Sequence, residues 1–156
     1  MSLVKVKEYF KKYNMEDKIM EFAISSATVT LASDAIGCTP DEIAKSLAFT
    51  VGDTHVIIVM AGNSRIDNAK YRKEFNTKAK MINKEELDKL IGHEVGGICP
   101  FAIHDNVLVY LDNSLKRFKY IYPACGSSNS AIKLSILELE KYSNYVKWID
   151  VCKEVK

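Results

Sequence analysis

The sequence has no long apolar run, little excess charge of either sign and no clustered cysteines. No apolar stretch approaches the length of a bilayer-spanning helix, and the first residues, MSLVK, lack the apolar run of a signal peptide. Lysine and arginine number 22 against 20 aspartates and glutamates, which gives a formal net charge of +2. This balance excludes a strongly basic nucleic-acid-binding protein, but not a local basic patch that grips one RNA end.

The four cysteines, Cys38, Cys99, Cys125 and Cys152, are far apart. They form no CxxC pair and have no neighbouring histidine at zinc-like spacing, so we expect neither a zinc site nor a disulfide framework. Reduced thiols are typical of a cytoplasmic protein, and we expect this location. The carboxylates and histidines also lack a ligand-like arrangement. We therefore expect no metal, no cofactor and no membrane association.

At 156 residues, the chain is long enough to bury a substantial core and most simply forms one domain over residues 1–156. Its 47% hydrophobic and 27% charged residues are typical of a soluble globular protein. No repeat, low-complexity tract or linker interrupts it. The composition therefore predicts one globular unit.

Capping and turn residues divide the chain into short helices and strands. Capping boxes are indicated at Thr39 with Glu42, where Pro40 follows the cap, and at Ser135 with Glu138. A further capping box is indicated at Asn83 with Glu86. The apolar runs 46–51 and 55–61 around the turn 52–54 indicate a hairpin, and the run 56–60 predicts a central strand buried on both faces. Helices are predicted at 2–14, 27–36, 39–44, 67–75, 83–91 and 135–142; strands are predicted at 18–25, 46–51, 55–61, 80–82, 107–111, 120–122, 131–135 and 145–152. This irregular alternation predicts a mixed α/β (α+β) fold.

The segment GHEVGGICPF, residues 92–101, is the most informative stretch of the chain. Three glycines and a proline lie between a predicted helix and a predicted strand. Glycine lets a ligand approach the main chain closely, and proline fixes its own backbone angle. The segment therefore predicts a stiff loop whose backbone groups face a ligand, although an ordinary turn has the same composition.

Three further segments accompany this loop: TPDEIAKSLAF at 39–49, GNSRID at 62–67 and YLDNSL at 110–115. Together, and in this order, they resemble the YbaK / prolyl-tRNA synthetase editing-domain family, whose members are aminoacyl-tRNA deacylases. The resemblance runs from Ala27 to about Leu139. It implies a mixed, partly closed β-barrel flanked by helices.

The resemblance also implies roles for individual residues. Lys45, predicted at a helix–strand junction, falls on the family's essential lysine, whereas its spacing alone favours a lysine with a solvated head. Gly96, Gly97 and Pro100 fall on the family's GxxxP loop, which positions the reacting ester and, with Ile98, limits amino-acid size. Cys99 replaces the serine more usual before this proline, which puts the pocket's specificity in doubt.

The same resemblance places three further positions near the substrate. Asp112 ends an apolar strand, where a helix N-cap is the simpler interpretation. Gly126 and Ser127 fall on a glycine-rich segment that borders the family's pocket, although Ala124 and Cys125 depart from its pattern. Phosphate contacts with tRNA are predicted for a basic run that is otherwise a solvated helix face, namely Arg65, Lys70, Arg72 and Lys73.

The implied function is trans-editing, in which the ester of a mischarged tRNA is hydrolysed. Expected substrates are cysteine or alanine on the tRNA for proline, recognised at the acceptor end. DNA is not an expected partner, and a prolyl-tRNA synthetase partner follows from the resemblance alone. Two alternatives stay open: a non-catalytic tRNA- or synthetase-binding module of the same fold, and a thiol hydrolase that acts through Cys99, close in sequence to His93 and His104.

Overall fold

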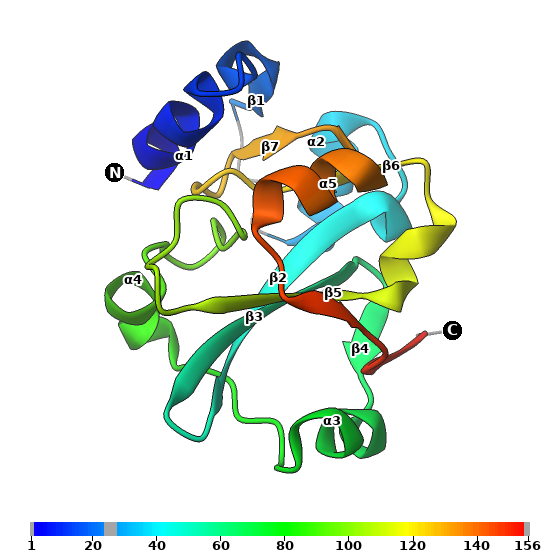
Figure 1. Cartoon of the computed structure of the whole chain (residues 1–156). Coiled ribbons are helices and arrows are strands. Elements are labelled where there is room, and N and C mark those ends of the chain that lie inside the picture. Colours follow the sequence, from blue (N-terminus) through cyan, green and yellow to red (C-terminus); the bar gives the residue numbers. More distant parts are fainter. Residues whose placement is uncertain (1, 24–27, 155–156) are drawn as a thin grey trace.

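A mixed six-stranded sheet forms the centre of the computed structural model, which describes residues 2–23 and 28–154 (Figure 1). The sheet curls into a half-barrel, and this confirms the predicted mixed α/β fold. Its strand order is β8-β6-β2-β3-β5-β9, with parallel pairs β2–β6, β3–β5 and β5–β9. The strands are β2 (Ile43–Val51), β3 (Thr54–Ala61), β5 (Leu108–Asp112), β6 (Tyr120–Pro123), β8 (Leu134–Ser135) and β9 (Lys147–Ile149).

Two smaller sheets and several short helices surround this sheet. β1 (Ile19–Glu21) pairs with β7 (Ser130–Ile132), and β4 (Ser64–Ile66) pairs with β10 (Cys152–Glu154). The α-helices are α1 (Ser2–Lys11), α2 (Val29–Ile36), α3 (Asn68–Phe75), α4 (Leu87–Leu90) and α5 (Ile136–Ser143). The 3-10 helices are η1 (Glu16–Lys18), η2 (Pro40–Glu42), η3 (Lys84–Glu86) and η4 (Asn113–Arg117). None of the helices in the described ranges has the length and apolarity needed to cross a bilayer.

The predicted hairpin forms between β2 and β3, in antiparallel register from Ala44↔Ala61 to Val51↔Thr54. Gly52 turns the chain with a φ of 59°, a conformation that glycine adopts without steric cost. β3 is fully buried from its third residue onward, as the apolar run predicted. The hairpin is therefore the part of the sheet that the sequence specified best.

Two hydrophobic clusters lie on opposite faces of this hairpin, because successive side chains of a strand point to opposite faces. The larger cluster contains Ala44 and Ala48 and extends to α1, where Phe10 packs against Phe101 with ring centroids 4.8 Å apart. The smaller cluster contains Phe49 and extends to α3 and the C-terminal strands. Even-numbered residues of β2 thus face the larger cluster, and odd-numbered residues face the smaller one.

Several predicted boundaries were wrong. β2 begins at Ile43 rather than residue 46, so Lys45 lies within the strand and the capping box at Thr39 starts only a 3-10 turn. The predicted strand 18–25 is ordered as a strand only at β1, and residues 24–25 lie outside the described residues. The segment 80–82 contributes a single bridge, Phe49↔Met81, and Asn83 makes no side-chain capping bond.

The last two predicted strands are each divided between two sheets. Residues 131–135 supply both β7 and β8, and residues 145–152 supply both β9 and β10. In the second case the break coincides with Val151, whose N–H donates to Asp112 Oδ1 at 2.9 Å. Val151 therefore lies between β9, which pairs with β5, and β10, which pairs with β4, and its N–H bonds a side chain.

Asp112 fixes this corner of the fold. Its carboxylate is buried, accepts a bond from Ser114 N at 2.8 Å as the N-cap of η4, and accepts a second from Val151 N. Charge-assisted bonds of this kind are stronger than neutral ones. One side chain therefore joins the end of β5 to the C-terminal segment.

We expect Asp112→Ala to lower the free energy of unfolding by about 2–4 kcal/mol, because the helix loses its cap and a buried N–H loses its acceptor. Urea denaturation followed by far-UV circular dichroism measures this change. The matched control is Asp150→Ala, which removes an exposed carboxylate 3.1 Å from Lys70 and is expected to cost less than about 1 kcal/mol. Equal stability of the two variants would contradict this account of Asp112.

Candidate functional site

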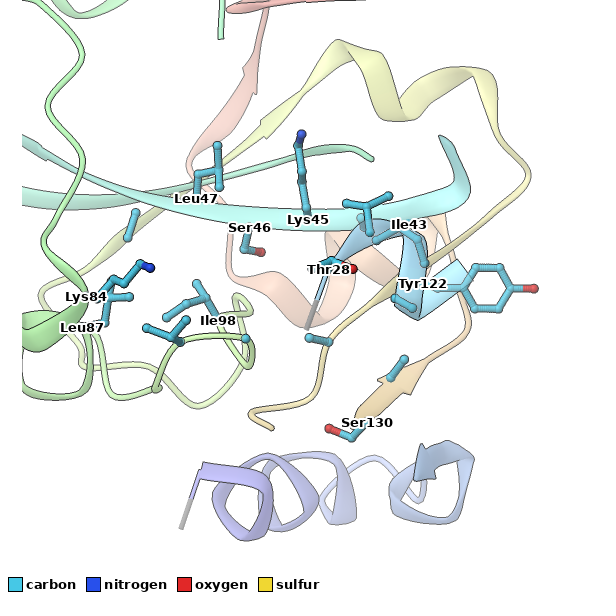
Figure 2. Close-up of a pocket in the computed structure, with 18 of the residues that line it drawn as sticks. Thr28, Ile43, Lys45, Ser46, Leu47, Lys84, Leu87, Ile98, Tyr122 and Ser130 are labelled. Atoms are coloured by element: carbon cyan, nitrogen blue, oxygen red, sulfur yellow. The ribbon is translucent and has the colours of Figure 1, made fainter. Parts of the chain in front are cut away.

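A mainly apolar cavity of about 320 Å³ lies beside β2 (Figure 2). Its apolar wall comes from α2, β2, the segment 81–87, the loop 95–98 and the strands β6 and β7. Polar side chains on the wall are few. Those with hydroxyl or ammonium groups are Thr28, Lys45, Ser46, Lys84, Tyr122 and Ser130.

The cavity exists because β2 lacks a strand neighbour along part of one edge. On that edge, β6 pairs only with Ile43 and Ala44, and the next contact is the bridge between Phe49 and Met81. Within the described ranges, no strand pairs with the stretch between them on this side. The gap leaves backbone groups of β2 facing the cavity.

The glycine–proline loop supplies one wall of this cavity. Gly96 and Ile98 line it, and Gly96 has a φ of 87°, in the left-handed region that favours glycine. Gly97, Cys99 and Pro100 are buried and are not among the described lining residues. The loop thus presents some residues, Val95 included, to the cavity and packs the others into the protein.

Gly97 holds this loop against the segment that contains Gly126. Gly126 N donates to Gly97 O at 3.1 Å, and a β-carbon at Gly97 would lie 2.4 Å from the Gly126 carbonyl carbon. Such a contact is far inside van der Waals distance, so only glycine permits this approach. The structure therefore brings together two segments that the sequence analysis assigned to one site.

The Gly126 segment continues into a chain of side-chain hydrogen bonds. Ser127 Oγ donates to Asn129 Oδ1 at 2.9 Å and lies 2.6 Å from Ser130 Oγ. Because a hydroxyl has one hydrogen, Ser130 must donate to Ser127. Ser127 does not line the cavity within the described residues, whereas Ser130 does. Ser127 therefore holds a wall residue in place.

Lys45 contributes to the cavity wall, but its ammonium group lies on the other face of β2 (Figure 2). Lys45 Nζ donates to Gly62 O at 3.1 Å. Burial lowers the pKa of Lys45, the nearby Cys152 raises it and Arg65 lowers it. In this conformation the structure does not bring the ammonium and the loop 96–100 together.

Cys99 is fully buried beside His93, with Sγ 3.5 Å from His93 Nε2. The same Nε2 lies 2.6 Å from Phe101 O. A carbonyl oxygen only accepts, so Nε2 must carry the hydrogen and has no lone pair to take a proton from Cys99. Burial raises the pKa of Cys99 to about 12 and lowers that of His93. This geometry is that of a packed thiol and does not support the thiol-hydrolase alternative.

The other predicted residues lie away from the cavity. Asp112 is buried at the corner described above and is not a described lining residue. Arg65 lies on β4, and α3 carries the remaining basic residues, at the end of the molecule opposite α2 and β7 (Figure 1). Lys70 is engaged with Asp150 Oδ1 at 3.1 Å and with Cys152 O at 2.9 Å. Arg72 and Lys73 are exposed there.

The sequence analysis missed several residues of the cavity wall. Ser46 follows Lys45 directly, and the alternation of side chains along a strand would have placed the two on opposite faces. Lys84 and Ser130 gave no such signal, because they reach the wall from η3 and β7 through tertiary contacts. In the described part of the chain, no group of three or more His, Cys, Asp or Glu side chains is arranged to hold a metal.

Comparisons with known proteins show similarity in sequence and in fold. The family model described as "Aminoacyl-tRNA editing domain" matches residues 25–142. A Bacillus subtilis (strain 168) protein named uncharacterized protein YwhH is 48% identical over 99% of both chains. A proline–tRNA ligase of Shouchella clausii is 30% identical over 66% of this chain, which spans 18% of that relative. The solved structure of a proposed trans-editing enzyme for prolyl-tRNA synthetase covers 97% of each chain, with a TM-score of 0.87 and 22% identity, a likeness of fold.

We expect iodoacetamide at pH 8 to alkylate Cys38, the half-buried thiol, and to leave Cys99 unmodified in the folded protein. A pKa of about 12 and full burial keep Cys99 a thiol, so its reaction should be at least about a hundredfold slower than in unfolded protein. Peptide mass spectrometry before and after addition of guanidinium chloride measures both rates, and Cys38→Ser identifies the fast signal. Rapid alkylation of Cys99 in folded protein would instead support the thiol-hydrolase alternative.

Proposed function

Because the chain belongs to the aminoacyl-tRNA editing domain family, we propose that it is a trans-editing deacylase. It hydrolyses the ester of a mischarged tRNA that carries a small amino acid. The expected substrates are cysteine or alanine on the tRNA for proline. A cytoplasmic location and an encounter with prolyl-tRNA synthetase are parts of the same proposal, as is a single editing domain over residues 1–156.

The observation that carries this proposal is the apolar cavity at the open edge of β2, next to the loop 96–100. Val95, Gly96 and Ile98 narrow the cavity from one side, and Leu87 and Ile82 close it from another. A cavity of about 320 Å³ is near the lower end of the range for small-molecule sites. We propose that this cavity holds a small side chain and that the loop residues limit the size of that side chain.

A separate hydrolytic site that selects by size is useful where the binding site of a synthetase discriminates poorly between small side chains. Hydrolysis of the ester then depends on positioning more than on a strong side-chain base. Backbone groups of the loop 96–100 and of β2 are the ones available to hold the ester in place. The rigid contact between Gly97 and Gly126 keeps the loop ready for this role.

Lys45 is proposed to stabilise negative charge that develops on the substrate. To do so, its ammonium must leave Gly62 O and pass the open edge of β2 toward the cavity. Burial lowers the pKa of Lys45 at its present site, so the charged form is less favoured there than in water. The ammonium charge would then act on the substrate in a partly water-excluded site, where electrostatic stabilisation is stronger than in water.

The tRNA itself is proposed to contact basic side chains outside the cavity. Arg65, Lys70, Arg72 and Lys73 stay candidates for phosphate contacts, although α3 lies far from α2 and the cavity wall beside it (Figure 1). Lys84 is exposed and lines the cavity, so it is the better placed cation for the acceptor end. Phosphate contacts of this type weaken as the salt concentration rises.

We expect the wild-type protein to release a small amino acid from mischarged tRNA for proline, and we expect Lys45→Ala to lower kcat/KM by about 10²-fold or more. Deacylation assays use this tRNA charged with alanine, cysteine or proline, together with cysteine on its own tRNA. Lys89→Ala, which removes an exposed lysine that does not line the cavity, is the matched control and should retain full activity.

Two outcomes would contradict the proposal. If neither the wild type nor Lys45→Ala releases any amino acid while both bind tRNA, the chain is the non-catalytic binding module. If Lys45→Ala retains full activity, the deacylase does not use this lysine. Filter binding at two salt concentrations provides the tRNA affinity needed to separate these results.

A further inference from the structure

Ser46 presents a hydroxyl with no partner beside the cavity. Its Oγ is covered from water and makes no hydrogen bond in the structure. Ser46 is one of the residues that line the cavity, and Figure 2 shows its side chain on the side of β2 where Ile98 and Thr28 lie. A buried hydroxyl without a partner is costly, so this group is ready to bind a ligand.

The position of Ser46 follows from the pairing of β2. The N–H and C=O groups of successive residues in a strand point to opposite edges. Ala48 O accepts from Ile82 N at 3.0 Å and Thr50 N donates to Lys80 O at 2.9 Å, so even-numbered residues face the cavity edge. Ser46 therefore directs its main-chain groups to the stretch of that edge where no described strand pairs with β2.

Two of the other wall hydroxyls, those of Ser130 and Thr28, are already engaged, and the Tyr122 ring points away from Ser46 (Figure 2). Ser130 donates to Ser127, and Thr28 Oγ1 accepts from Leu31 N at 3.1 Å as the cap of α2. The remaining wall beside Ser46 is apolar, formed by Ala44, Ala48, Ile82 and Ile98. In this conformation Lys45 Nζ lies on the other face of β2 from the Ser46 side chain (Figure 2).

We propose that Ser46 is a specificity-determining residue that hydrogen-bonds the side-chain hydroxyl or thiol of the aminoacyl group. This inference rests on the proposed deacylase function and narrows its substrates to small amino acids with such a group, serine and cysteine before alanine. The Ser46 hydroxyl turns about one torsion and both donates and accepts, which suits a neutral hydroxyl or thiol. Alanine has the size for the cavity but leaves Ser46 without a partner.

A site built to bind a hydroxyl discriminates against the analogue that lacks it, because its own polar group stays unpaired. The size of the cavity alone cannot provide this discrimination, since alanine is smaller than serine or cysteine. Ser46 thus adds a chemical filter to the size filter of the loop 96–100. Removal of its hydroxyl should abolish the preference without loss of the fold.

The test compares wild type, Ser46→Ala and Ser143→Ala with tRNA for proline charged with serine, cysteine or alanine. Ser143 has the same kind of buried, unpartnered hydroxyl, but it lies on α5 and does not line this cavity. In Ser46→Ala, kcat/KM for the seryl and cysteinyl substrates should fall about fivefold to tenfold, and that for the alanyl substrate by less than about twofold. Ser143→Ala should leave all three ratios unchanged.

Thermal unfolding is measured in parallel, and Ser46→Ala is expected to be at least as stable as the wild type because it removes an unpaired buried group. An equal loss with all three substrates would assign Ser46 to a group they share and would overturn the proposal. So would an unchanged preference for serine and cysteine in Ser46→Ala.

Binding of amide-linked seryl- and alanyl-adenosine, measured by calorimetry, separates this inference from the deacylase function. If the wild type hydrolyses none of the esters but binds the seryl compound more tightly through Ser46, the specificity proposal stands and the deacylase proposal fails. If the wild type hydrolyses the esters and Ser46→Ala changes neither preference nor binding, the deacylase stands and the Ser46 proposal fails.

Discussion

The antiparallel pairing of β2 with β3 is the constraint on which the rest of the structure depends. Its register sets which residues of β2 face each hydrophobic cluster, and a shift by one residue would exchange the two sets. Because β3 occupies one edge of β2, only the other edge can pair with β6 and with the segment 80–82. The gap lies between these two partners. The cavity is this gap, covered by α2 and the loop 96–100.

Close backbone approach is the second feature that shapes the cavity. Gly97 meets Gly126 at a distance that no side chain tolerates, and the two segments are joined by a main-chain hydrogen bond. Ser127, Ser130 and Asn129 extend this contact to the cavity wall. Rigid positioning of a loop in this manner suits a site that relies on orientation and size more than on a strong base.

Buried polar groups have different roles in this protein. Asp112 and His93 are buried, and their hydrogen bonds to the main chain organise a corner and the glycine–proline loop. Ser46, by contrast, is beside the cavity with its hydroxyl unpaired. An unsatisfied group in a native interior needs a reason, and ligand binding is the one that its position supplies.

Local signals in the sequence were sufficient for the hairpin, the capping boxes, the buried central strand and the mixed α/β fold, because each depends on neighbouring residues. The resemblance of four short segments was sufficient for the family. The orientation of Lys45 was not available, because it required the start of β2 at Ile43 and therefore the strand's phase. The break between β9 and β10 was likewise hidden, since Val151 bonds Asp112, which is far away in sequence.

The sequence by itself determined the periodic patterns and turn residues from which the elements form, and the glycines that the loop requires. Only the tertiary structure decided which residues surround the cavity. Packing brings together residues from different segments, and a sequence pattern carries no distance between segments. The pairs concerned are Gly97 with Gly126, Ser46 with Ile98, and Cys99 with His93. For the same reason the cysteine that looked reactive in sequence is buried beside a histidine that cannot accept its proton.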